Sequence, residues 1–317
     1  LRTFAALGLS FECVSQGECE HVMKDLPGID AGKILFTPNF APRSEYVWAL
    51  EHGVNLTIDN LYALREWGDL FRNRDLLIRI DTGFGRGHHD HVRTAGVHSK
   101  FGVPLFELDE AERLVKKVGA RVVALHAHTG SGVFDVRNWK EVGHVLGDLV
   151  QRFPEARAID LGGGLGVPEK PGQVPVDLAA LQGVIDEIRA KFPKLSLWIE
   201  PGRFLVAQGG VLVVEVTQLK GKGAVQYVGV ATGMNSLIRP ALYGAHHDIV
   251  NLTRLGETGT EIYNIVGPIC ESADYLGHER LLPPTKDGDV LLIANAGAYG
   301  HAMSSNYNLL EPACEVI

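Results

Sequence analysis

The sequence predicts an α/β protein in which strands and helices alternate as far as residue 200, followed by an antiparallel β domain. Seven short β-branched or apolar runs each end in a small or polar residue and precede a segment with helical periodicity. After Gly202 the pattern changes to long apolar alternation with few helical segments. Alternating strands and helices form a parallel sheet, which is either doubly wound or closed as a (β/α)8 barrel.

The expected elements follow in order along the chain. Strands are expected at residues 11–14, 34–37, 54–59, 76–81, 122–126, 158–161 and 197–200. Helices are expected at residues 17–24, 44–51, 61–71, 109–117, 139–153 and 178–192. Residues 1–8 already have a helical pattern, so a barrel would lack its first strand in this chain.

Four further strands are expected in the C-terminal part, at residues 210–219, 226–231, 261–266 and 289–294. We therefore expect an α/β domain over residues 1–210 and a β domain over residues 211–317. A chain of 317 residues is more than a single hydrophobic core usually fills, which agrees with two domains.

Composition excludes several classes of partner. The net charge of −8 argues against nucleic acid or an anionic membrane, because phosphates need a basic surface. No apolar run reaches the roughly 20 residues of a membrane helix, and the N-terminus shows no targeting signal. The four cysteines form no CxxC pair or disulfide framework, which favours a reducing compartment such as the cytoplasm.

Two polar motifs follow neighbouring predicted strands, where an α/β barrel places its ligands. Gly162, Gly163 and Gly164 could bring bare backbone N–H groups to phosphate oxygens, although a tight turn without ligand is the alternative. The spacing does not match GxGxxG, which argues against a dinucleotide site. In Glu200-Pro201-Gly202-Arg203, the guanidinium could bind an anion and Glu200 could accept from a ring nitrogen; a structural ion pair is the alternative.

Histidines form two further clusters. His126 and His128 could be a metal pair or hydrogen-bonded strand residues, and without a third ligand at evident spacing we expect no metal. His88, His89 and His91 are interpreted as a polar loop over the site rather than a metal centre.

Several motifs together carry a resemblance that spans essentially the whole chain. Besides the glycines and Glu200-Pro201-Gly202-Arg203, they are Phe11-Glu12-Cys13-Val14-Ser15, Gly83-Phe84-Gly85-Arg86-Gly87-His88, Ser99-Lys100-Phe101-Gly102, His126-Ala127-His128-Thr129-Gly130-Ser131-Gly132, Gly233-Met234-Asn235, Ile238-Arg239-Pro240, Gly267-Pro268-Ile269-Cys270-Glu271-Ser272 and Gly297-Ala298-Tyr299-Gly300. In order and spacing the chain resembles the diaminopimelate decarboxylases, which belong to the alanine-racemase-like (fold type III) pyridoxal-phosphate enzymes. The resemblance implies a TIM-type (β/α)8 barrel with a C-terminal β domain, a pyridoxal 5'-phosphate cofactor and a homodimer with shared active sites. It also implies decarboxylation of meso-2,6-diaminopimelate to L-lysine, a step of lysine biosynthesis.

The resemblance further implies a role for individual residues. The catalytic residues would be Cys270, Glu200 and His128. The cofactor would be bound by His128, Ser131, Gly162, Gly163, Gly164, Glu200, Gly202, Arg203 and Tyr299. The substrate would be bound by Arg203, Arg239, Tyr243, Glu271 and Tyr299.

Three of these residues bear on the choice of reaction. Glu200 opposite the pyridine nitrogen would keep it protonated and the ring a strong electron sink, whereas racemases of this fold place an arginine there. Cys270 resembles the cysteine that reprotonates the carbanion across a dimer interface, although a lone cysteine is more often inert core. Glu271 with Arg239 favours a substrate with a distal carboxylate over ornithine or arginine.

One departure from the family pattern concerns the cofactor lysine. The family holds the cofactor as a Schiff base on a lysine in the first barrel strand, and none of the twelve lysines here lies at a matching position. We expect the chain to be a fragment of a longer product and to be inactive alone. A non-catalytic pyridoxal-phosphate-binding or regulatory homologue is the alternative, and another basic amino-acid decarboxylase of ornithine or arginine type is a further one.

Overall fold

The computed structural model describes residues 1–83 and 99–316. Two compact units divide the chain, the first comprising Leu1–Gly164 with Val176–Pro201 and the second Leu165–Pro175 with Gly202–Ile317. The division after Pro201 lies nine residues before the boundary expected at residue 210, and the segment Leu165–Pro175 is an excursion that the sequence did not indicate. His88, His89 and His91 lie outside the described residues.

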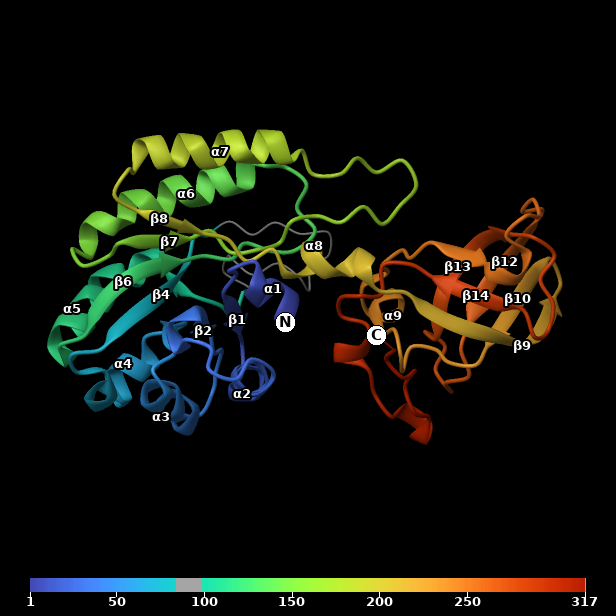
Figure 1. The fold of residues 1–317 in the computed structure, drawn as a ribbon, viewed down its shortest axis with the longest axis horizontal. Helices are drawn as coiled ribbons and strands as arrows, with labels where there is room; N and C mark the ends of the chain where they lie inside the picture. The colour runs from blue at the N-terminus through green and yellow to red at the C-terminus, as the bar shows by residue number, and fades with distance from the viewer. Residues whose placement is uncertain (84–98, 317) are drawn as a thin grey trace. The chain divides into compact units, whose positions relative to one another are not determined.

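The first unit contains a parallel sheet of TIM-like type (Figure 1). Its strands are β1 (Phe11–Cys13), β2 (Ile34–Phe36), β3 (Asn55–Ile58), β4 (Asp75–Asp81), β5 (Val103–Pro104), β6 (Arg121–His126), β7 (Ala158–Asp160) and β8 (Ser196–Trp198). Apart from β5, which pairs with β4, the strands lie side by side in chain order. Among the described residues no ladder joins β8 to β1. The seven expected strands are confirmed, and β5 is an addition of two residues.

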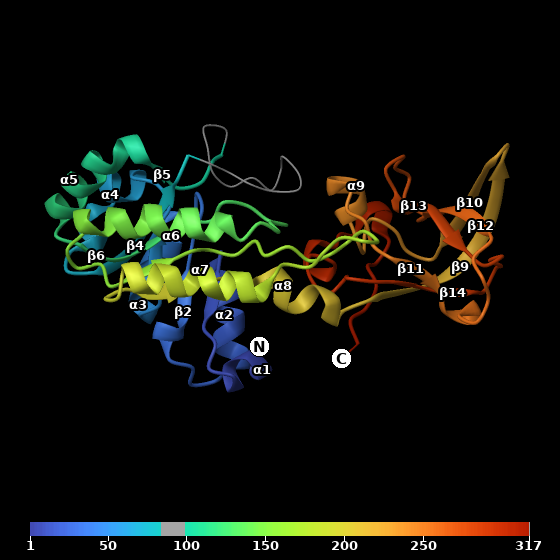
Figure 2. The same ribbon diagram turned by 90° about the horizontal axis from the view of Figure 1, so that it is seen from above.

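Helices connect these strands as the βα repetition predicts. They are α1 (Arg2–Ala6), α2 (Gln16–Asp25), α3 (Arg43–His52), α4 (Tyr62–Glu66), α5 (Leu108–Val118), α6 (Arg137–Leu149) and α7 (Leu178–Lys191). Ser15 and Asp177 cap α2 and α7 by accepting hydrogen bonds from backbone N–H groups of the first turn. Both views show α6 and α7 packed side by side (Figures 1 and 2).

The helix expected at residues 61–71 is broken in two. A 3-10 helix, Gly68–Phe71, follows α4. A Cβ at Gly68 would lie 2.5 Å from Val118 at the end of α5, so the close approach of two segments requires glycine there. Tertiary packing therefore overrides a continuous helical pattern at this position.

Apolar side chains fill the inside of the sheet, and polar groups gather where the strands end. Leu76, Leu77, Ile78 and Ile80 of β4 are buried, as are their neighbours in β3 and β6. Four buried polar residues lie at the ends of strands or directly after them, namely Thr37, Asp59, His126 and Asp160, and Arg79 lies two residues before the end of β4. The carboxyl end of the sheet is thus the polar end, as in barrels that place their ligands there.

The second unit contains a six-stranded sheet around its own apolar core. Its strands are β9 (Leu212–Lys222), β10 (Val225–Val230), β11 (Ile249–Asn251), β12 (Glu261–Val266), β13 (Tyr275–Leu282) and β14 (Val290–Ile293). The ladders are antiparallel except between β10 and β12, so the sheet is mixed rather than purely antiparallel. Two short helices, α8 (Gly202–Val206) and α9 (Arg239–Tyr243), complete the unit.

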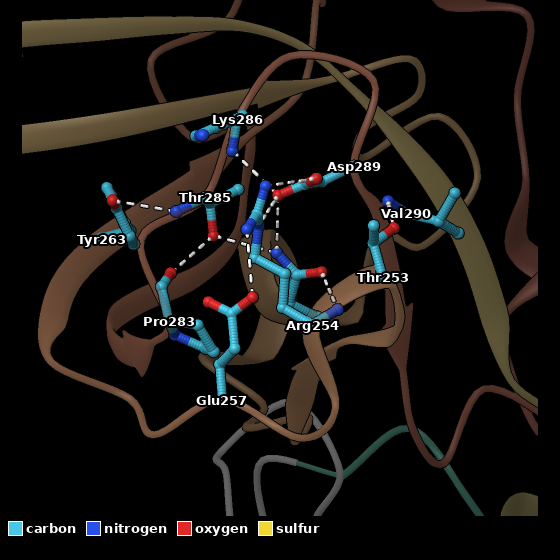
Figure 3. Close-up of polar contacts among 10 residues, drawn as sticks. Thr253, Arg254, Glu257, Tyr263, Pro283, Thr285, Lys286, Asp289 and Val290 are labelled. Carbon is cyan, nitrogen blue, oxygen red and sulfur yellow. Dashed lines mark hydrogen bonds and ion pairs between the residues drawn. The ribbon is translucent and has the colours of Figure 1, made fainter.

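A buried carboxylate joins two segments of the second unit (Figure 3). Asp289 accepts from Arg254 Nε at 2.7 Å, from Asn251 Nδ2 at 3.0 Å and from the Lys286 N–H at 2.9 Å. These hydrogen bonds hold the pKa of Asp289 below its usual range, although burial acts in the opposite direction.

Two further expectations concern membranes and cysteines. Among residues 1–83 and 99–316, the helices are all too short or too polar to cross a membrane. All four cysteines are unpaired, with Cys13 and Cys19 buried and Cys270 and Cys314 exposed.

Candidate functional site

The three glycines after β7 allow three backbone segments to approach one another. Gly162 has φ +66°, and a Cβ there would lie 2.5 Å from Ala127 O and 3.0 Å from His128 Nδ1. At Gly163 a Cβ would overlap Glu200 O, and at Gly164, with φ +89°, it would overlap Gly130 O. Glycine is therefore required by backbone packing as well as by any ligand.

Two of these glycine amides already have acceptors. Gly162 N–H donates to Asp160 Oδ1 at 2.9 Å, and Gly163 N–H donates to His128 Nδ1 at 3.1 Å. Phosphate binding by Gly162 and Gly163 stays a prediction, and it would require their amides to exchange these acceptors for phosphate oxygens. Gly164 lies against the segment that carries Ser131, since its Cβ would come 3.6 Å from Ser131 Cα.

His128 is a neutral ring held in one orientation. Burial, with a smaller contribution from Arg79, lowers the pKa of His128 to about 3, although part of the residue is exposed to solvent. Because Nδ1 accepts from Gly163 N–H, the proton resides on Nε2. A neutral, oriented imidazole suits contact with the face of a flat ligand.

Glu200 follows β8 and presents one carboxylate oxygen without a donor. Its Oε2 lies 3.3 Å from His126 Nε2, while Oε1 is buried and receives no hydrogen bond from an N–H or hydroxyl group of the described residues. Burial raises the pKa of Glu200 to about 7, against the lowering effects of Asp160 and Arg79. A group that donates a proton to Oε1 would satisfy this carboxyl.

Further ionisable groups surround Glu200 that the sequence did not single out. Burial and, to a smaller extent, the nearby Glu200 raise the pKa of Asp160 to about 8. Burial also raises the pKa of Glu12, in β1, to about 7. Arg79, in β4, lies 3.8 Å from Asp59 and faces the same group. In the sequence, these residues could have been found as charged residues inside or at the end of otherwise apolar strands.

The same region bears on the question of a metal. Ligand-type atoms of His126, Asp160 and Glu200 lie within 4.8 Å of one another, whereas His128 is not part of this group. Folding therefore brings Asp160 and Glu200 to His126, although no sequence spacing marks either of them as a third ligand. Burial favours the protonated form of both carboxyls, which opposes a cation, so we interpret the group as a hydrogen-bonded cluster.

Arg203 and Arg239 share a carboxylate in the second unit. Arg203 is only 8% exposed and Arg239 only 2%. Glu169 Oε1 forms an ion pair with both guanidinium groups and lies 2.6 Å from Arg239 Nη2. His247 accepts from Arg239 Nη1 at 3.0 Å through Nε2, while its Nδ1–H donates to Ala294 O at 2.7 Å. Burial lowers the pKa of His247 to about 4, so this histidine is neutral. The cluster keeps one net positive charge, which suits one further anion.

Sequence reasoning identified both arginines but missed Glu169 and His247. Glu169 lies 34 positions from Arg203 and 70 from Arg239, and no local pattern marks it.

The remaining candidates of the second unit are more accessible. Cys270 and Glu271 are exposed, Tyr243 is half-buried, and Tyr299 is 50% exposed with φ +57°. Asn308 holds Cys270 from both sides, because its Nδ2 lies 3.0 Å from Sγ and its Oδ1 accepts from the Cys270 N–H at 2.9 Å. Gly202 begins α8 directly before Arg203.

Comparisons with known proteins identify the family of this chain. The family described as "Pyridoxal-dependent decarboxylase, pyridoxal binding domain" matches residues 1–207. The diaminopimelate decarboxylase of Methanothermobacter thermautotrophicus is 34% identical over all of this chain and 76% of its own length. That of Escherichia coli K12 is 33% identical over 97% of this chain and 78% of its own length.

Solved structures give the same result for the fold. A crystal structure of a diaminopimelate decarboxylase has a TM-score of 0.87 and 31% identity, covering 97% of this chain and 77% of the other. The enzyme from Helicobacter pylori, complexed with L-lysine, has a TM-score of 0.86 and 29% identity, with 96% and 78% covered. The chain belongs to the diaminopimelate decarboxylase family of pyridoxal-dependent decarboxylases.

Proposed function

We propose that this protein decarboxylates meso-2,6-diaminopimelate to L-lysine with pyridoxal 5'-phosphate, as a step of lysine biosynthesis. The observation that carries the proposal is Glu200 Oε1, a buried carboxylate oxygen that receives no N–H or hydroxyl donor from the described residues. Oε1 lies at the carboxyl end of the sheet, and a protonated pyridine nitrogen is a donor of the right kind for it. The lysine complex of the Helicobacter pylori relative supports the product assignment.

The residues of the first unit fit such a ring. When bound, the cofactor supplies an electron sink for the electrons left at the substrate Cα after loss of carbon dioxide. Glu200 would hold a proton on the ring nitrogen, and the neutral His128 would contact the ring. Ser131 and Gly164 would contribute to phosphate binding. Gly162 and Gly163 contribute by shaping the turn, since their amides are engaged with Asp160 and His128.

The second unit contributes the groups proposed for phosphate and substrate. Gly202, Arg203 and Tyr299 belong to the cofactor set; Arg203, Arg239, Tyr243, Glu271 and Tyr299 belong to the substrate set. The single net positive charge around Glu169 matches the distal carboxylate of a diamino diacid. Ornithine and arginine have no such carboxylate, so neither would supply an anion for the positive charge that remains after Glu169 pairs with the two arginines.

Cys270 is proposed to deliver the proton that replaces carbon dioxide. The Sγ–H bond breaks, the proton moves to Cα, and a thiolate remains that solvent reprotonates. The exposed thiol and the contact of Asn308 with Sγ at 3.0 Å suit this role, in a site shared between two copies of the chain. Homodimer formation and a cytoplasmic location are parts of the same proposal.

The decisive experiment uses the complete gene product that contains this chain. It is incubated with pyridoxal phosphate and meso-diaminopimelate, ornithine or arginine in parallel, and released carbon dioxide and lysine are measured. We expect carbon dioxide and lysine from diaminopimelate alone. Turnover of ornithine or arginine instead would refute the substrate. Cofactor binding without any carbon dioxide would instead support a regulatory homologue.

Arg239→Ala tests the substrate assignment more closely. It should raise the KM for diaminopimelate while the affinity for the cofactor stays near that of the wild type. Equal loss of both would show that Arg239 acts on the fold of the second unit and not on the substrate.

A further inference from the structure

The polar cluster beneath Glu200 contains a carboxyl group with no part in the proposed reaction. Asp160 is the last residue of β7 and is 1% exposed. Its Oδ1 accepts from Gly162 N–H at 2.9 Å, and its carboxyl group has an oxygen within 4.8 Å of a carboxylate oxygen of Glu200. Two buried carboxyl groups this close favour a state in which one of them carries a proton, because two negative charges would repel each other.

The surroundings decide where that proton resides. His126 Nε2 lies 3.3 Å from Glu200 Oε2, and burial keeps this imidazole neutral by lowering its pKa. Its Nε2–H therefore donates to Glu200, while the buried Nδ1 has no hydrogen-bond partner among the described residues. Because His126 donates to Oε2, Glu200 is the carboxyl group better suited to be ionised. Asp160 is then the one better suited to carry the proton.

Other charges face the pair from the neighbouring strands. Glu12 in β1 raises the cost of a second negative charge, while Arg79 in β4 stabilises the charge on Glu200. Arg79 also faces Asp59, which follows β3 and accepts from Asn39 and Gly102. Among residues 1–83 and 99–316, Arg79 is thus the full positive charge that these carboxyl groups share, and one such charge is too few for all of them to ionise.

We propose that Asp160 is a positioning residue that shares one proton with Glu200, so that the pair carries a single negative charge directed at the ring nitrogen of the cofactor. A protonated Asp160 can donate to the Glu200 oxygen that His126 already contacts and so limit the orientations of the carboxylate. It also prevents a second anion from forming beside the first, because like charges at this distance in a buried site are strongly unfavourable. The part that concerns the ring nitrogen rests on the proposed function, whereas the shared proton does not.

The shared proton can be observed directly by infrared spectroscopy of the cofactor-free protein in D2O near neutral pD. Aspartate labelled with 13C at the side-chain carboxyl separates the band of protonated Asp160 from those of glutamates. We expect a protonated aspartate band that disappears in Asp160→Asn. The control Asp289→Asn removes an aspartate with a lowered pKa and should leave the band unchanged. An unchanged spectrum in Asp160→Asn would overturn the proposal.

A second measurement uses the pH dependence of the free energy of unfolding, whose slope gives the number of protons bound or released on unfolding. The raised pKa of Asp160, about 8, means that the folded state binds a proton that the unfolded state has lost above about pH 4. Stability should therefore fall as pH rises towards 8, and Asp160→Asn should reduce this slope by about one proton. The same slope in both proteins would contradict proton sharing.

Cofactor binding then tests the positioning role. Asparagine keeps a donor for Glu200 and an acceptor for Gly162 N–H, so Asp160→Asn should bind pyridoxal phosphate within about twofold of the wild type. Asp160→Leu removes both and should weaken binding about tenfold or more. Equal weakening by both variants would refute the positioning role. If the wild type does not bind pyridoxal phosphate while its infrared band is present, the proposed function fails and the proton sharing stands.

Metal analysis closes the remaining alternative. The ligand-type atoms of His126, Asp160 and Glu200 lie close enough to surround a cation. One equivalent of metal in the purified wild type that is lost in Asp160→Asn would overturn the proposal. Purified protein without stoichiometric metal supports it.

Discussion

Gly162→Ala is the substitution whose cost follows most directly from the coordinates. Gly162 has φ +66°, and a Cβ would lie 2.5 Å from Ala127 O, about 0.5 Å inside the closest approach that real Cβ atoms show. Both neighbours on this side belong to backbone or to His128, so no flexible side-chain end can move away.

Two terms contribute to the expected loss of stability. Placing alanine in the left-handed region costs about 1–2 kcal/mol, and forcing a methyl group into a packed site costs about 1–3 kcal/mol. Together these predict a loss of about 2–5 kcal/mol in the free energy of unfolding. The strain falls on the turn that orients His128, so cofactor affinity should fall as well.

Gly53→Ala is the matched control, since Gly53 has φ +70° and nothing lies within 4 Å of its Cβ position. It should lose only the conformational term. Chemical denaturation followed by circular dichroism measures both variants, and fluorescence of bound pyridoxal phosphate measures affinity. Equal losses in the two variants would refute the overlap, because the difference of about 1–3 kcal/mol is attributed to it alone.

Three further predictions concern the second unit. Glu169→Gln leaves two buried guanidinium groups without their counter-ion and should lower the free energy of unfolding by about 3 kcal/mol or more in chemical denaturation. An added carboxylate ligand should restore part of this stability, and an unchanged stability would mean that Glu169 is not their counter-ion. Asp289→Asn should cost about 2–3 kcal/mol at pH 7 through its bond to Arg254. Because the pKa of Asp289 is lowered on folding, this stabilisation is present above the unfolded pKa and is lost as pH falls through the folded one, so the two proteins should converge in acid and a constant gap would argue against the ion pair. Cys270→Ser should lower kcat by about 100-fold or more with little change in KM, as measured by carbon dioxide release, and a normal rate would exclude Cys270 as the proton donor.

The sequence was sufficient for most of the fold because hydrophobic periodicity reports local geometry. Each of the seven expected parallel strands has a counterpart in the sheet. Missed elements have identifiable causes. β13 interrupts its apolar alternation with His278, Glu279 and Arg280, and Glu279 has φ +51°, which no strand pattern indicates. β11 is only three residues long.

The candidate site was less accessible from the sequence because its partners meet only after folding. Glu200 and His128 follow strands and match a known motif, so both could be identified. Asp160 occupies an equally visible strand end, yet its role depends on proximity to Glu200, 40 positions later in the chain. Glu169 lies in an irregular segment, and only the folded second unit shows which arginines it meets.

The excursion Leu165–Pro175 has a consequence for any attempt to dissect this protein. Glu169 comes from that excursion, whereas the arginines it neutralises come after Gly202. A polypeptide that begins at residue 202 would include both guanidinium groups and lack their carboxylate. The two units are therefore not separable at a single peptide bond, and recombination between relatives would have to exchange the turn after β7 together with the C-terminal sheet.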